Sequence, residues 1–344
     1  MIWAGGPLTA GVVVLAACFT TTSAIEQAFA QEIAYFRIGA GAPGSTLYDL
    51  AGQIAGAISN PPGSRQCDND GPCGVEGIIG LAQTTTDPVD SLQSVEDGQT
   101  ESAIVSADIA DAAAQGTGPF KKSGSMVDLR AIANVGQLVL HVMVAKEARF
   151  QNIAALSGQR IAIGAKDSDN AVTARFLLRA AGVSEKKTKF ITGDTDTAAH
   201  DLLEDKVDAL VLVAQLPNAD VASLMQTGNY RLLGGQVSDD NTSSYVVADW
   251  IPRQQYSGAD ATPTLSLPAV WVVRDSLSAD LAGGLAKALW HVAAKAGEPP
   301  APGKIRLDID RVSLPLHPGA KAAFDELRKA EGDVLAPSQA NTTN

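Results

Sequence analysis

The sequence is poor in the residue types on which many recognisable functional sites depend. Its 344 residues include only three cysteines and four histidines, and aromatic residues make up 5%. Three cysteines are too few for a disulfide scaffold, and so few aromatic residues argue against a surface that stacks sugars or bases. The four histidines are scattered along the chain and none lies near a second histidine or a cysteine, so a catalytic metal is not expected.

Motifs of catalysis are missing as well. The sequence contains no G-x-S-x-G, no P-loop and no Cys/His signature, and its carboxylates form no recognisable acid–base pair. We therefore expect no cofactor and no enzyme activity. An exported enzyme stays open as an alternative, because catalytic groups can meet only in the fold.

The charge balance is acidic, with 26 Lys and Arg against 38 Asp and Glu and a formal net charge of −12. An acidic chain repels phosphate backbones, so binding to nucleic acid or to an anionic membrane is not expected. Hydrophobic residues make up 45%, which is enough for a sizeable core. The length predicts about two domains.

The first thirty residues are interpreted as a secretory signal. An apolar run of 12 residues, 8–19, is too short to cross a bilayer but is typical of a signal peptide, although no Lys or Arg precedes it. Cleavage after Ala30, at an A-x-A site, competes with lipidation of Cys18; a buried N-terminal element is a further alternative. Both export interpretations place the protein in the periplasm.

Short apolar runs alternate with amphipathic segments along the rest of the chain. Strands are expected at 33–38, 75–81, 102–105, 129–135, 138–145, 160–164, 188–191, 209–213, 230–233 and 265–273. Helices are expected at 47–58, 89–95, 107–114, 171–181, 195–204, 219–226, 277–292 and 319–330. This alternation is typical of βαβ units and mostly parallel sheets, and its two groups predict two α/β lobes.

Two turns are the strongest candidates for binding. Gly39–Thr46 follows the first strand, and the helix after it directs free N–H groups and a positive dipole end at this place. The second lobe repeats the arrangement at Gly164–Asn170, where Ser168 and Asn170 can cap the helix. Two facing helix N-termini predict a cleft for a small anion. Ordinary tight turns are the alternative, and the spacing does not fit the G-x-G-x-x-G of dinucleotide sites.

Cys67 and Cys73 lie in one polar loop, CDNDGPC. In an exported protein a local disulfide is the favoured interpretation. A metal site is the weaker alternative, because no histidine is near.

Several segments together resemble the TAXI family of solute receptors from TRAP transporters. The most specific are FRIGAGAPGSTLYDLAG and PLHPGA, and the similarity runs from Tyr35 to Glu331. The resemblance implies a type II periplasmic binding protein fold, in which two α/β lobes with mostly parallel sheets are joined by crossing hinge strands. The expected parts are a signal peptide at 1–30, the first lobe at 31–140, the second lobe at 141–249, a return to the first lobe at 250–335, and a disordered tail at 336–344.

The resemblance also implies a function and a set of site residues. A small organic anion, an amino acid such as glutamate or a dicarboxylate, would bind between the lobes and be delivered to a TRAP membrane permease. The candidate ligand-binding residues are Ala42, Ser45, Thr46, Tyr48, Ser106, Asp108, Gln137, Ser168, Asn170 and Gln215. The chain has Ser106-Ala107-Asp108 where the family usually has Gln-Ser-Asp, which predicts different hydrogen bonds to the ligand. The same fold serving an ABC importer or a sensor kinase is the alternative.

Overall fold

The structure is a computed structural model that describes residues 33–64, 73–241, 243–295 and 303–330. The expected signal peptide, Cys18, Cys67 and the expected C-terminal tail lie outside the described residues. Cys73 is described and is disulfide-bonded, while its predicted pairing with Cys67 stays a prediction.

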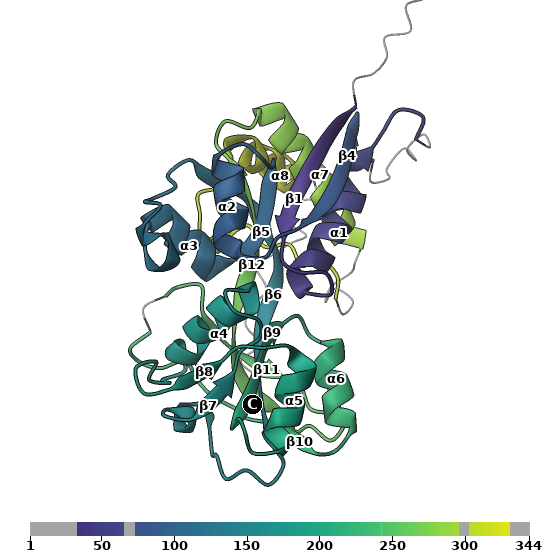
Figure 1. The fold of residues 1–344 in the computed structure, drawn as a ribbon. Coiled ribbons are helices and arrows are strands. Elements are labelled where there is room, and N and C mark those ends of the chain that lie inside the picture. The colour runs from purple at the N-terminus through teal and green to yellow at the C-terminus, as the bar shows by residue number, and fades with distance from the viewer. Residues whose placement is uncertain (1–32, 65–72, 242, 296–302, 331–344) are drawn as a thin grey trace, which may run out of the picture. The chain divides into compact units, whose positions relative to one another are not determined.

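The observed elements follow the expected alternation closely (Figure 1). The strands are β1 (Ala34–Ala40), β2 (Ser59–Asn60), β3 (Val75–Glu76), β4 (Ile78–Thr84), β5 (Ser102–Ser106), β6 (Leu129–Ala145), β7 (Arg160–Ala162), β8 (Lys189–Ile191), β9 (Ala209–Ala214), β10 (Tyr230–Leu232), β11 (Val247–Ile251) and β12 (Thr262–Arg274). The α-helices are α1 (Thr46–Ile58), α2 (Pro88–Glu96), α3 (Ala107–Gln115), α4 (Asp169–Ala180), α5 (Thr195–Leu203), α6 (Ala219–Gln226), α7 (Ala279–Lys295) and α8 (Pro318–Ala330). Strand β11 was not expected from the sequence.

One continuous sheet carries both lobes, in the order β4-β1-β5-β12-β6-β9-β7-β8. In the first lobe β4, β1 and β5 are parallel, and β12 runs antiparallel beside β5. In the second lobe β8, β7 and β9 are parallel, and β6 runs antiparallel beside β9. Each lobe therefore has parallel strands followed by one antiparallel crossing strand. The predicted fold class, a type II periplasmic binding protein, is confirmed.

Strands β6 and β12 pass between the lobes (Figure 1). Strand β6 pairs with β12 up to Val139, and from Val139 to Met143 it pairs with β9. The prediction of two separate strands at 129–135 and 138–145 was wrong, because Gly136 does not break the strand. A β-carbon at Gly136 would lie 2.8 Å from Gln215 Nε2, so this glycine marks a close approach of neighbouring groups.

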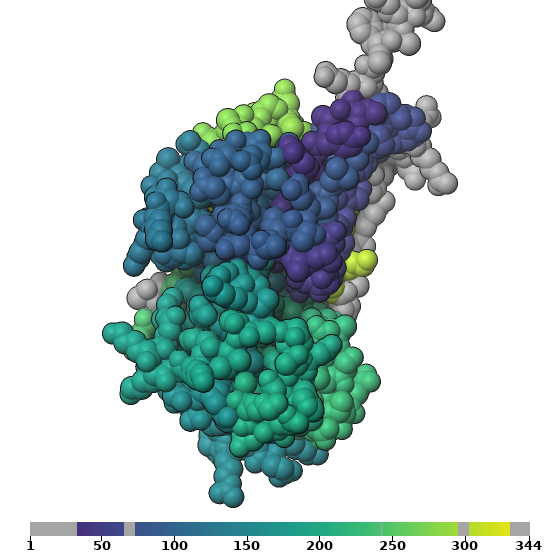
Figure 2. Space-filling model, viewed as in Figure 1, coloured from purple at the N-terminus to yellow at the C-terminus, as the bar shows by residue number. Residues whose placement is uncertain are grey.

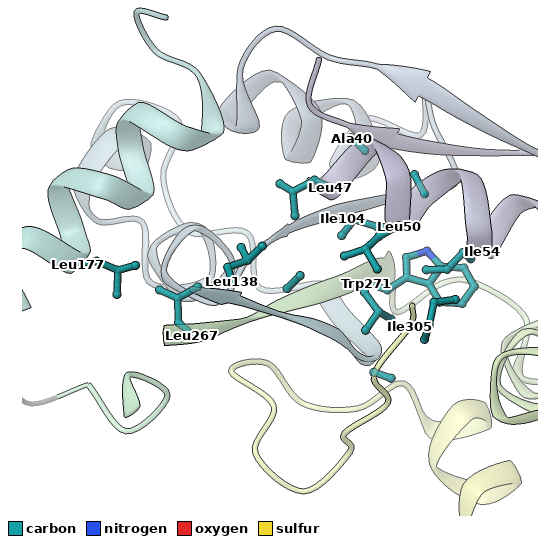
Figure 3. Packing of buried hydrophobic residues seen from close by; sticks show 14 of the residues in the cluster. Ala40, Leu47, Leu50, Ile54, Ile104, Leu138, Leu177, Leu267, Trp271 and Ile305 are labelled. Atoms are coloured by element: carbon teal, nitrogen blue, oxygen red, sulfur yellow. The ribbon is translucent and has the colours of Figure 1, made fainter. Parts of the chain in front are cut away.

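The core of the first lobe forms where α1 covers the sheet. Leu47, Leu50 and Ile54 recur on one face of this helix and pack over Ile104 and Trp271 (Figure 3). All five side chains are buried. Burying each large apolar side chain contributes about 1.5–3 kcal/mol, so this face fixes the position of α1 and of the turn that precedes it.

A second core cluster belongs to the second lobe. Leu210 and Leu212 of β9 pack there with Ile251, Tyr256 and Ala259. Residues 251–259 thus lie in the second lobe, although a return to the first lobe was predicted at 250. The chain crosses back later, within β12. In the described part of the chain, no helix combines the length and the apolar character needed to span a bilayer.

Candidate functional site

The predicted site residues come from both lobes and collect where the parallel strands end. Carboxyl ends of parallel strands lie at one edge of a sheet, where ligands of open α/β sheets usually bind. The turn after β1, the junction of β5 with α3, the turn before α4 and the residues after β9 supply nine of them. The tenth, Gln137, lies on β6.

The turn after β1 ends in a capped helix. Ser45 is the N-cap of α1, and its Oγ accepts a hydrogen bond from Tyr48 N–H at 3.3 Å. Thr46 Oγ1 accepts from Gln215 N–H at 3.2 Å, which joins the start of α1 to the end of β9. Ala42 is exposed and Tyr48 is half-buried. This turn therefore meets the second lobe directly.

The matching turn in the second lobe is also capped. Ser168 Oγ accepts from Ala171 N–H at 3.2 Å and is the N-cap of α4. Asn170 does not cap this helix: its Nδ2 donates to Ile163 O and Val211 O, and its Oδ1 accepts from Val213 N–H. Because its amide is fully engaged, Asn170 ties the ends of β7 and β9 together. Its expected role as a cap of α4 is therefore wrong, whereas its expected role as a ligand contact stays a prediction.

A buried hydroxyl pair joins the lobes where β5 meets α3. Ser106 Oγ lies 2.7 Å from Thr173 Oγ1, and Thr173 Oγ1 donates to Asp108 Oδ1 at 3.4 Å. All three side chains are buried, and burial raises the pKa of Asp108 to about 6. Ser106 and Asp108 were predicted as site residues, but Thr173 was missed. The available signal was a threonine among apolar residues on the buried face of its helix.

Asp169 is the second residue at the boundary between the lobes that the sequence prediction missed. It opens α4 and faces the first lobe: a β-carbon at Gly41 would lie 2.7 Å from its Oδ2 and 3.0 Å from Ser45 Oγ. Burial raises the pKa of Asp169 to about 7, and the charges of Asp87 and Asp108 add to the rise. Only a residue without a side chain at position 41 leaves room for this carboxylate.

The two glutamines among the predicted ligand-binding residues lie beside the crossing strands β6 and β12. Gln137 Nε2 donates to Ser266 Oγ at 2.7 Å, and Ser266 Oγ donates to Asp249 Oδ2 at 2.6 Å. Gln215 Nε2 lies at the Lys304 carbonyl, 3.5 Å away, beside Gly136. Both glutamine side chains therefore lie beside the crossing strands β6 and β12.

The two lobes touch, and on the face shown in Figure 2 their atoms meet without a gap. A further contact links Tyr245, whose ring stacks on Phe176 of α4, to Asp111 of α3, with Tyr245 OH 3.2 Å from Asp111 Oδ2. Together with the contacts of Thr46, Ser106 and Asp169, it makes this a closed arrangement.

Comparison with known proteins identifies the family of the chain. Residues 38–327 match the family described as NMT1-like. The chain belongs to the NMT1-like family. Among solved structures, it is similar to a periplasmic sulfonate-binding protein, SsuA, from Methylobacillus flagellatus, with 12% identity, a TM-score of 0.46, and coverage of 78% of this chain and 71% of that chain. It is also similar to the L-arginine-bound amino acid ABC transporter protein AbpA from Streptococcus pneumoniae, with 12% identity, a TM-score of 0.42, and coverage of 76% and 90%.

Two other polar residues of this NMT1-like protein lie away from the site. His141 is buried in the core of the second lobe, where Nδ1 donates to Val139 O and Nε2 accepts from Tyr256 OH. Burial lowers its pKa to about 4, so it is neutral at pH 7. The Arg175 guanidinium lies 5.3 Å from the ring centre of Phe190 on β8.

Two cavities of the NMT1-like protein lie elsewhere, and none of the predicted site residues lines either of them. The larger, about 510 Å³, is lined by residues near β10 and the start of β12, and the smaller, about 240 Å³, lies around Arg274. Within residues 33–64, 73–241, 243–295 and 303–330, no group of three or more Asp, Glu, His or Cys side chains is arranged to hold a metal ion.

Proposed function

We propose that this NMT1-like protein is an extracytoplasmic solute receptor that captures a small polar solute between its lobes and delivers it to a membrane permease. The observation that carries the proposal is that two capped helix N-termini, at Ser45 and Ser168, stand on opposite lobes beside contacts that cross between them. Helix N-termini attract negative groups. A receptor that closes on a solute would use two such helix N-termini, one on each lobe, to hold a negative group of that solute between the lobes.

Closing and opening would occur by bending of the two crossing strands. A solute that contacts both lobes only in the closed form shifts the population toward that form. Thr46, Ser106 and Thr173 form hydrogen bonds between the lobes without a solute. They would help close the protein, and Ser45, Tyr48 and the turn at Ala42 would face the solute.

The charges favour an amino acid over a dicarboxylate. Asp108 and Asp169 stand at the same boundary, and no Lys or Arg among the described residues forms a salt bridge with either of them. A second carboxylate of a solute would meet their repulsion. The ammonium group of an amino acid would instead pair with Asp169, while its carboxylate would lie at the helix N-termini.

The partner is proposed to be a TRAP-type permease, on the resemblance of the FRIGAGAPGSTLYDLAG and PLHPGA segments to TAXI receptors. An ABC importer or a sensor kinase is the alternative partner. A neighbouring gene for a large permease with many membrane spans would support the TRAP assignment, whereas a neighbouring ATPase or kinase gene would overturn it. Export to the periplasm by the signal at 1–30 is part of the proposal, and cell fractionation tests it.

Ligand screening tests the proposal. Thermal unfolding is measured with a panel of amino acids and dicarboxylates, and each compound that raises Tm is titrated by calorimetry. We expect at least one amino acid to raise Tm and to bind with a 1:1 stoichiometry. Asp169→Asn should weaken its binding at least tenfold, whereas the exposed Asp205→Asn should leave it unchanged. A panel in which no solute raises Tm would contradict the receptor function.

A further inference from the structure

We propose that closing of the two lobes takes up a proton from water, which is held on the carboxylate pair of Asp108 and Asp169. The pair is assembled only when the lobes meet, because Asp108 belongs to α3 of the first lobe and Asp169 to α4 of the second. The proposal concerns the protein without any solute. It is therefore independent of the solute class proposed above.

The closed arrangement buries the carboxylate of Asp108 and leaves Asp169 half-buried. Asp108 is 6% exposed and accepts a hydrogen bond from Thr173 Oγ1, which comes from the other lobe. Asp169 is covered by the turn after β1, where a β-carbon at Gly41 would lie 2.7 Å from Oδ2. A buried carboxylate is costly when charged unless it is paired or fully hydrogen-bonded.

The surrounding elements supply negative rather than positive charge. On the first lobe, the ionisable neighbours are Asp87, which is the N-cap of α2, and Asp111 of α3. The turn after β1 has no ionisable residue.

On the second lobe, the ionisable neighbours are Tyr245, Asp167 and Lys166. Tyr245 OH lies 3.2 Å from Asp111 Oδ2, and Lys166 is largely exposed, with its Nζ 3.6 Å from Asp167 Oδ2. Among the described residues, neither Asp108 nor Asp169 has an ion-pair partner. A proton is therefore the positive charge available to the closed, solute-free protein.

The direction of the pH dependence follows from these contacts. Burial raises the pKa of Asp169 to about 7 and that of Asp108 to about 6 in the closed form. In an open form both side chains would face water and have pKa values near the usual 3.8 of an aspartate. The closed form thus binds more protons, and acidification favours it. The ratio of closed to open protein should change by up to about tenfold per pH unit for each proton taken up.

Small-angle X-ray scattering of the solute-free full chain tests the proposal between pH 5 and pH 8.5. We expect the radius of gyration to be smaller at pH 5 than at pH 8.5, because the closed-to-open ratio rises as the pH falls below the raised pKa values of the two Asp groups. Asp169→Asn removes one charge without changing the shape of the side chain, so this variant should stay compact to a higher pH.

The matched control is Asp167→Asn, two residues away. Asp167 is exposed and has φ of 58°, a conformation that asparagine also adopts. This variant should show the same pH response as the wild type. If Asp169→Asn fails to fold, as judged by circular dichroism, Asp108→Asn replaces it.

Two results would overturn the proposal: a wild-type radius that does not change with pH, or Asn variants that respond to pH as the wild type does. Either result would leave the receptor function standing, because solute-induced closure is measured separately at a fixed pH. Conversely, proton-linked compaction without binding of any solute would support this proposal and contradict the receptor function.

Discussion

Replacing Gly41 by alanine should hold the lobes apart. The added methyl carbon would lie 2.7 Å from Asp169 Oδ2 and 3.0 Å from Ser45 Oγ, which is closer than ordinary van der Waals contact. Both neighbours are polar groups fixed by burial or by a helix cap, so the closed form must shift to accept the methyl group. In the open form the contact with Asp169 would be absent, and only the 3.0 Å contact with Ser45 Oγ of the same turn would remain.

The magnitude follows from the cost of overpacking. Forcing an extra methyl group into a packed site costs about 1–3 kcal/mol. At about 1.4 kcal/mol per factor of ten, this lowers the closed-to-open ratio about 5- to 150-fold. The affinity for any solute that requires closure should fall by the same factor.

Titration calorimetry with the amino acid that raises Tm most in the screen measures this loss, and thermal unfolding checks the fold. Gly52→Ala is the matched control, because Gly52 is exposed on α1 and a β-carbon there would meet nothing within 4 Å. It should leave affinity unchanged and stabilise the helix by about 0.5–1 kcal/mol. A Gly41→Ala protein with wild-type affinity would refute the closed geometry.

Three further predictions concern stability. Asn170→Ala removes three hydrogen bonds that join β7 and β9 and should lower the free energy of unfolding by about 2–4 kcal/mol in urea. Glu101→Gln weakens the paired hydrogen bonds from Arg37 and should cost about 1 kcal/mol. Burial raises the pKa of Glu101, but Arg37 lowers it below its usual range overall, so this contribution should be present at neutral pH and lost as the pH falls through the lowered pKa. Burial lowers the pKa of His141 to about 4 from the usual 6.5, so the unfolded chain binds a proton that the folded protein does not. Wild type should therefore lose about 1.4 kcal/mol of stability per pH unit relative to His141→Gln as the pH falls from 6.5 to 4.

Much of the fold could be predicted from the sequence, because apolar spacing reports burial directly. The expected helix at 47–58 is α1 within one residue, and the expected helix at 219–226 coincides with α6. The continuity of β6 could not be predicted, because a glycine inside a strand pattern looks the same whether it bends the chain or permits a close contact. Gly136 permits a close contact and does not interrupt the strand.

The candidate site could be predicted only in part. Ser45 and Ser168 were found because a helix cap is a local property of the sequence. Thr173 and Asp169 were missed because their importance depends on what the other lobe places opposite them. Asn170 looked like a cap by sequence, but the strand ends beside it occupy all of its polar atoms.

Native mass spectrometry of the protein purified from its own host tests the receptor function most directly. We expect a fraction of the molecules to carry one added small-molecule mass, which is lost on denaturation and restored when the identified compound is added back. A chain that carries no added mass, and that binds none of the metabolites extracted from the same host, would contradict the account.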